Sequence, residues 1–183
     1  MKLKSLIGLF LIIFIARGEM KDINLETDLS LIGNGIVITP NEEGIISSRV
    51  SLEHGVKKVV SDSEASQVTF IKSTLGNLPS GLRLKIYLHA DSQRLNNLVI
   101  GASEKFEEKI PHVLTGEILS GQTLSKDRLE ITGSKIEDES ELITTDKILA
   151  VKLHSKILGE DMLGKKTGNY ENVSTLSVKL LAE

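Results

Sequence analysis

The chain has 183 residues, and its 22 lysines and arginines against 25 aspartates and glutamates give a formal net charge of -3, which argues against a nucleic-acid-binding protein. It contains no cysteine, which excludes disulfides, zinc–thiolate sites and thiol catalysis. Hydrophobic residues make up 40% and aromatic residues only 3%, so we expect a single domain with a core of isoleucine, leucine and valine.

The first 18 residues predict a secretory signal peptide. Lys2 and Lys4 precede the apolar run 6–16, and Ala16 and Gly18 place small residues at positions -3 and -1 of a cleavage site. The apolar run is shorter than the roughly 20 residues that cross a bilayer, which disfavours a membrane anchor. We therefore expect cleavage after Gly18 and export of the remaining 183 - 18 = 165 residues.

The clearest pattern of the exported chain lies at its start, in 22–31. Apolar residues and one threonine occupy alternate positions, and polar residues occupy the positions between them. A period of two is typical of a β-strand with one buried face. We predict that this face consists of Ile23, Leu25, Thr27, Leu29 and Leu31.

Short strands separated by turn residues are predicted along the rest of the chain, as in a β-sandwich. Helical patterns are scarce: 101–110 fits a helix or a loop, and the acidic run 137–141 is interpreted as a solvated loop. We therefore predict one all-β domain over 33–183, preceded by the N-terminal strand segment 19–32. The predicted strands are 36–39, 46–52, 68–71, 82–90, 110–119, 129–132, 148–154 and 173–181.

No arrangement of residues typical of a catalytic, cofactor-binding or metal site is found. The four histidines, His54, His89, His112 and His154, are dispersed, and none forms a metal-binding pair. His89 and His154 lie on the polar faces of predicted strands and are interpreted as surface residues. The glycosylation sequon at 172–174 lies inside a predicted strand and is interpreted as chance. We predict no enzyme activity and no cofactor.

Three stretches of the chain resemble a known family, the major pilins of class 5 (alpha-type) chaperone–usher fimbriae, of the colonisation-factor-antigen kind. The stretch 21–28 is similar to the family's alternating N-terminal donor strand. The stretch 109–124 resembles its mid-chain strand pair, with an Ile-Pro entry and a Gly-x-x-Leu-Ser turn. The stretch 166–176 resembles its closing Gly-x-Tyr motif and last strand.

This resemblance implies an incomplete immunoglobulin-like β-sandwich that lacks its seventh strand. In this family, a periplasmic chaperone fills the gap first, and at the outer-membrane usher the N-terminal extension of the next pilin subunit replaces it. The implied product is an adhesive surface fimbria, with identical or related pilins and a tip adhesin as partners. The donor residues are the five named above, and the acceptor groove and last strand include Tyr170, Leu176, Val178 and Leu180.

Two other interpretations stay open. The segment 22–31 could be an ordinary edge strand of its own domain, and the protein a monomeric secreted or periplasmic β-sandwich that binds a ligand through its loops. An enzyme would need a site assembled from scattered carboxylates. Within the fimbrial interpretation, Thr27 marks a shallow point of the groove, so Thr27→Arg is expected to block the joining of subunits but not capture by the chaperone.

Overall fold

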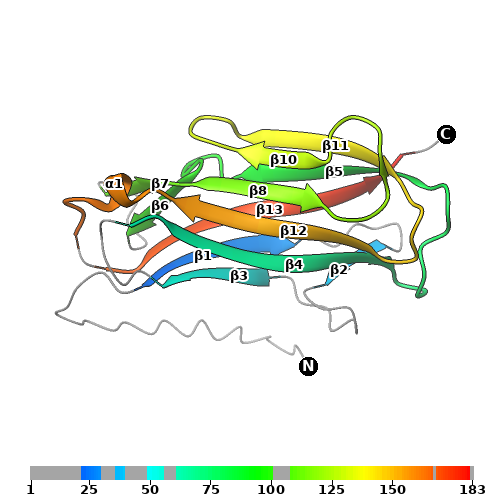
Figure 1. The fold of residues 1–183 in the computed structure, drawn as a ribbon, viewed down its shortest axis with the longest axis horizontal. Coiled ribbons are helices and arrows are strands. Elements are labelled where there is room, and N and C mark those ends of the chain that lie inside the picture. Colours follow the sequence, from blue (N-terminus) through cyan, green and yellow to red (C-terminus); the bar gives the residue numbers. More distant parts are fainter. Residues whose placement is uncertain are drawn as a thin grey trace, which may run out of the picture.

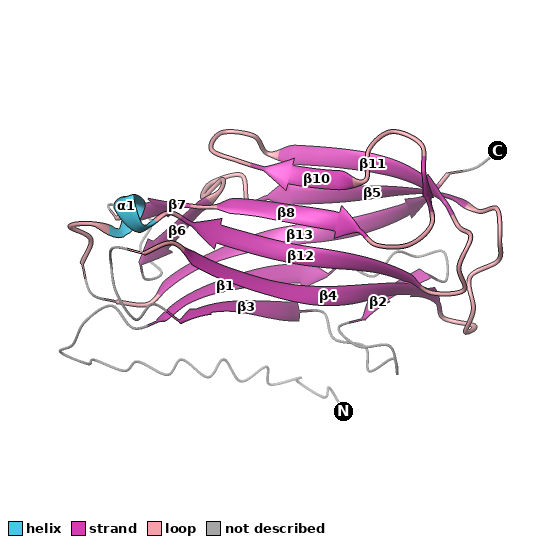
Figure 2. Cartoon of the chain, viewed as in Figure 1, coloured by secondary structure: helices cyan, strands magenta, loops and turns pink. Residues whose placement is uncertain are grey.

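The computed structural model describes residues 22–29, 36–39, 49–55, 61–100, 108–166 and 168–181. Within these ranges the chain forms two stacked β-sheets and one short helix, α1 (Gly159–Met162), at one end of the molecule (Figures 1 and 2). The predicted all-β class is confirmed. In the same ranges, no helix has the length and apolar character that crossing a membrane would require.

The first sheet, sheet A, has eight strands. Its order is β3 (Arg49–Gly55), β1 (Asp22–Leu29), β13 (Tyr170–Leu180), β5 (Arg83–Ala90), β11 (Glu137–Ile143) and β9 (Gln122–Thr123). Two short strands, β6 (Asn97–Ile100) and β7 (Lys109–Pro111), extend it beside the start of β13.

The second sheet, sheet B, has five strands in the order β10 (Arg128–Ile131), β8 (Val113–Ile118), β12 (Leu149–Ile157), β4 (Ser63–Ser73) and β2 (Ile36–Thr39). All its pairings are antiparallel. Among the described strands of both sheets, the only parallel pair is β1 with β13.

The core lies between the sheets, because each long strand alternates buried and more exposed residues. Leu84, Ile86 and Leu88 of β5 are fully buried, as are Val151 and Leu153 of β12 on the opposite sheet. These side chains belong to one large aliphatic cluster. A smaller cluster closes the end that carries β6, β7 and α1, and it consists of Leu98, Ile110, Ile157, Met162 and Tyr170.

The prediction of a loop at 137–141 was wrong, because these residues belong to β11. Glu137, Glu139 and Glu141 point outward. They alternate with inward positions, where Asp138 and Ser140 are buried. Lys126 and Lys135 contact the carboxylate of Asp138, and Ser140 Oγ donates a hydrogen bond to the carbonyl of Lys126. The two lysines therefore balance the charge of the buried Asp138, and this pairing cannot be read from the number of charged residues in the sequence. The sequence also did not predict β6, β9 or α1.

Candidate functional site

The N-terminal strand β1 lies inside sheet A, where it pairs with β3 on one side and β13 on the other. In Figure 1 it runs beside β3. We call the position between β3 and β13 the slot. Four predicted donor residues, Ile23, Leu25, Thr27 and Leu29, belong to β1, whereas Leu31 and the proposed signal peptide lie outside the described residues. Within one chain, the slot is thus filled by the chain's own strand.

The register places the predicted donor positions of β1 opposite buried residues of β13 and, at two rows, opposite the buried Leu52 and His54 of β3. Along β13, these neighbours are buried at each second residue, from Tyr170 to Val178. The rows across the slot are Ile23 with Tyr170 and His54, Leu25 with Asn172 and Leu52, Thr27 with Ser174 and Val50, and Leu29 with Leu176.

The four predicted acceptor residues all belong to β13. Tyr170, Leu176 and Val178 are fully buried, and Leu180 is half-buried. The hydroxyl of Tyr170 donates a hydrogen bond of 2.9 Å to the carbonyl of Lys166, which satisfies its one polar atom. The structure therefore brings these side chains to one face of one strand, along the side of the slot.

The inward face of β13 also carries two polar residues that the sequence analysis did not select, Asn172 and Ser174. Both lie at even-numbered positions, as the four predicted acceptor residues do. The alternation of the strand could therefore have identified them as inward-facing. Asn172 donates through Nδ2 to the carbonyl of Leu95 (3.1 Å) and accepts through Oδ1 from the amide of Val173 (2.8 Å). Since its side chain is buried and bonded, the sequon at this position is not accessible to a glycosyl donor.

Polar side chains gather in the interior near the same end of the slot, and we call this group the polar end. His54 of β3 and Ser63 of β4 join the two sheets through a contact of 3.2 Å between Nδ1 and Oγ. Nδ1 of His112 lies 2.9 Å from the carbonyl oxygen of Asn96. The polar end consists of His54, Ser63, Asn96, His112, Ser155, Asn172 and Ser174.

Several atoms of the polar end have no hydrogen-bond partner among the residues that the structure describes. They are His54 Nε2, Asn96 Oδ1, His112 Nε2, Ser155 Oγ and Ser174 Oγ. The pKa values of both His54 and His112 are lowered to about 4, chiefly by burial, and the nearby His154 contributes to the lowering at His54. Both imidazoles are therefore neutral at pH 7, so these two histidines contribute no charge to the polar end.

The strand β3 depends on β1 for its place in sheet A. Among the described strands, β3 pairs only with β1. If β1 leaves, β3 keeps the contact between His54 and Ser63 on sheet B, while the edge of β13 loses its hydrogen-bonding partner. An empty slot would consequently expose two unpaired strand edges, a strong template for another strand.

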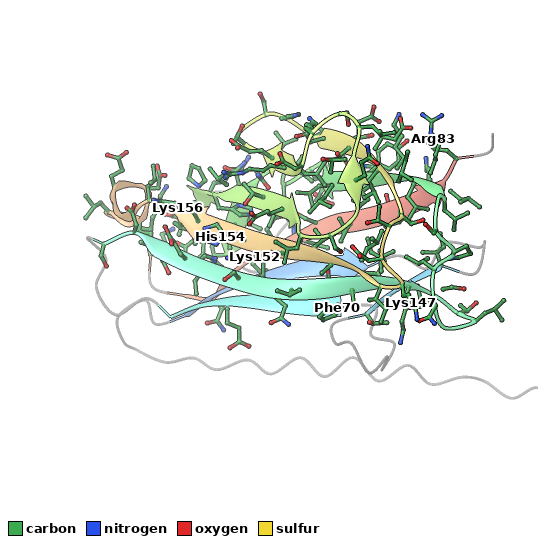
Figure 3. All side chains as sticks on the ribbon, turned by 45° about the vertical axis from the view of Figure 1, so that its right-hand side comes forward. Phe70, Arg83, Lys147, Lys152, His154 and Lys156 are labelled. Carbon is green, nitrogen blue, oxygen red and sulfur yellow. The ribbon has the colours of Figure 1, made fainter. Side chains whose placement is uncertain are left out.

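A second feature lies on the outer face of sheet B, where a shallow polar groove of about 390 Å³ crosses β8, β10 and β12. Lys152 and His154 line it and follow one another along β12 (Figure 3). Arg128 and Lys152 both stand opposite Glu117 in the strand register. The remaining lining residues are Thr115 and Asp127.

The two histidines interpreted as surface residues do lie on outer faces, although both are partly covered. His89 contacts Glu137 (3.4 Å) and Ser177 (2.9 Å) and stacks on Tyr87. Within the described ranges, no group of three or more histidine, aspartate or glutamate side chains could hold a metal ion.

Comparison of the sequence with known proteins found no match. No protein-family model matches the chain, and no curated protein matches its sequence.

Proposed function

We propose that this protein is a structural subunit of an adhesive surface fibre that polymerises by donor-strand exchange. The observation that carries the proposal is the position of β1, a terminal strand held between β3 and β13. A neighbouring copy carries the same strand, so it can fill the same slot with the same contacts. Exchange of an identical element between copies is a low-cost route to assembly.

The connection after β1 also supports exchange. β1 ends at Leu29 in sheet A, and β2 begins at Ile36 in sheet B. The segment 30–35 can span about 20 Å when fully extended, which exceeds the distance of about 10 Å between two packed sheets. The sequence between the two strands contains Gly33-Asn34-Gly35, and glycine is the residue with the widest range of allowed backbone angles.

The expected gain per junction is large enough to hold a fibre. Burying one leucine or isoleucine side chain contributes about 1.5–3 kcal/mol, so a donor strand with Ile23, Leu25, Leu29 and Leu31 supplies roughly 6–12 kcal/mol before entropy is subtracted. Main-chain hydrogen bonds on both sides add to this value. The sum is comparable with the stability of a whole small domain.

The proposed partners follow from the resemblance to the class 5 chaperone–usher pilins. They are identical or related pilin subunits, a periplasmic chaperone that holds the slot before assembly, an outer-membrane usher and a tip adhesin. The proposed location is the cell surface, reached through the periplasm after removal of residues 1–18. An immunoglobulin-like topology belongs to this proposal as well, beyond the confirmed all-β class.

A monomeric secreted or periplasmic binding module is the second candidate function, and two observations favour it. β1 is paired on both sides within its own chain, which suits a self-sufficient monomer. The groove beside Lys152, His154 and Arg128 offers polar groups on an outer face. This candidate predicts that the chain stays monomeric at every concentration.

The distinguishing experiment measures the size of the mature chain, residues 19–183, by light scattering as its concentration rises. We expect oligomers whose mean mass falls when an excess of a peptide spanning residues 20–32 is added, because the peptide occupies free slots. The matched control is the same peptide with Thr27→Arg, which we expect to leave the mass unchanged. A constant monomer mass with and without peptide would favour the binding module instead.

A further inference from the structure

The strand β1 runs away from the end of the sandwich that carries α1, which we call the helix end. It starts opposite Tyr170, which belongs to the same buried cluster as Met162 of α1. It finishes at Leu29, which stands opposite Leu176. Because a strand rises about 3.3 Å per residue, β1 leaves the slot about 20 Å beyond the row of Tyr170.

The next strand, β2, starts at the opposite end of the sandwich. β4 begins at Ser63, which pairs with Ile157 just before α1, and it finishes at Ser73. Ile36, the first residue of β2, pairs with Ser73. Figure 1 shows β2 on the far side of the molecule from α1. We call this end the connection end, because Leu29 and Ile36, the residues before and after the segment 30–35, both lie toward it.

This placement determines which ends meet when two copies exchange β1. A strand that fills the slot of another copy in the observed register leaves that slot toward the connection end. Its chain must then reach its own Ile36 within the span of the segment 30–35, which is about 20 Å when fully extended. Since Ile36 also lies toward the connection end of its own copy, the two copies are joined connection end to connection end.

The same contact also suits a second exchange in the reverse direction. Once the first copy has received a strand, its own displaced β1 and the empty slot of the second copy stand across the two connection ends. A two-fold arrangement satisfies both junctions, because each repeats the other. This second step takes place within one assembly, where a short connection gives an effective concentration on the order of millimolar. A third copy at micromolar concentration therefore competes poorly for the empty slot.

We infer that free copies of this chain exchange β1 reciprocally and close into a two-fold pair, in which the connection end of each copy is the surface that meets the other. The inference rests on the strand exchange of the proposed function and adds which product forms when nothing else occupies the slot. Both slots of such a pair are filled, so the pair does not grow. Growth into a fibre then requires another strand to hold the slot until the next subunit arrives, which is the role proposed above for the chaperone.

The experiment uses the mature chain with both Glu26→Cys and Val173→Cys, since these positions stand opposite each other in the register and the natural chain has no cysteine. Directly opposed strand residues lie within the distance that a disulfide spans. The chain is oxidised mildly at rising concentration, and linked species and free thiols are measured on non-reducing gels and by mass spectrometry. We expect dimers that hold two disulfides and no free thiol, with few larger species. The matched control replaces Val173→Cys by Lys152→Cys, on the outer face of sheet B, and should give few linked dimers.

A second measurement tests which ends meet in dimers that are isolated by gel filtration. Leu75→Cys places one spin label in the turn after Ser73, at the connection end, where Leu75 is 95% exposed. Leu163→Cys places one beside α1 at the helix end, where Leu163 is 55% exposed. The pair predicts a shorter distance between the two labels at 75 than between the two labels at 163. Equal distances, or the reverse order, would overturn the inference.

The disulfide pattern separates the inference from the proposed function. A ladder of linked trimers and larger species that grows with concentration would overturn the closed pair and would support the fibre. Disulfides within single chains only, at every concentration, would overturn both, because no strand would then pass between copies.

Discussion

The two ends of the sandwich interior differ in chemistry. At one end, Leu84, Ile86 and Leu142 of sheet A and Leu149 of sheet B are fully buried in the aliphatic cluster. At the polar end, histidine, serine and asparagine side chains occupy the space beside the slot. The difference teaches that the aliphatic side chains whose burial stabilises the packing of the two sheets and the buried polar groups beside the slot belong to separate parts of the interior.

The largest expected effect comes from the aliphatic end. Leu142→Ala should lower the free energy of unfolding by about 2–5 kcal/mol, because it removes a fully buried side chain and leaves a cavity. Ser155→Ala at the polar end should cost less than about 1 kcal/mol or stabilise the fold, because the Ser155 hydroxyl is buried without a partner. Urea unfolding of both variants measures the difference, and equal losses would refute the comparison.

The second effect concerns pH, through the histidines of the polar end. The folded-state pKa values of His54 and His112 are lowered from 6.5 to about 4 because burial disfavours the charged form. Between these values the unfolded chain binds more protons than the folded chain, so stability is complete above pH 6.5 and falls as the pH drops toward 4. For His112, which is 2% exposed, the loss amounts to about 3 kcal/mol.

The variant His112→Gln should flatten this decline, measured as the free energy of unfolding in urea at pH 7, 5.5 and 4.5. His89→Gln is the matched control, because His89 lies on the outer face of β5 and is partly exposed. If His112→Gln and the parent chain show the same slope with pH, the neutral buried imidazole is refuted.

The smallest expected effect concerns Asp138, a buried carboxylate of β11 that lies outside the polar end. Burial alone would raise the pKa of Asp138, but hydrogen bonds from Lys126, Lys135 and the amide of Glu130 hold it at about 2. Its stabilising contribution is present above pH 3.8 and is lost as the pH falls toward 2.

At pH 7, Asp138→Asn should cost about 1–2 kcal/mol, since the exposed lysine side chains are screened by water. Near pH 2 the variant and the parent should unfold at similar urea concentrations. A cost that stays constant across this range would show that the carboxylate charge is not the cause.

Much of the fold could be predicted from local patterns. Strict alternation predicted β1 and β5, and the short apolar run at 36–39 has the bounds of β2. The prediction failed at β11, where charged residues alternate with inward positions that are themselves polar. A binary pattern of apolar and polar residues cannot recognise a strand whose inner face includes Asp138 and Ser140, since their burial depends on partners from 126 and 135.

The candidate site was less accessible to sequence reasoning, because it depends on contacts between distant segments. The hydrophobic alternation selected Ile23, Leu25, Thr27 and Leu29 and the apolar members of β13. Nothing local indicates that β1 runs parallel to β13 or that His54 meets Ser63 across the two sheets. The polar end was missed for the same reason: its members are ordinary surface residue types that become buried only through the packing of both sheets.

The most direct test of strand exchange uses two different chains, one with only Glu26→Cys and one with only Val173→Cys. A disulfide between these positions can then form only between copies, in the register of the slot. The control replaces Val173→Cys by Lys152→Cys, on the outer face of sheet B. Exchange predicts disulfide-linked pairs for 26 with 173 and few for 26 with 152. Absence of linked pairs at high concentration, while both cysteines placed in one chain close readily, would contradict it.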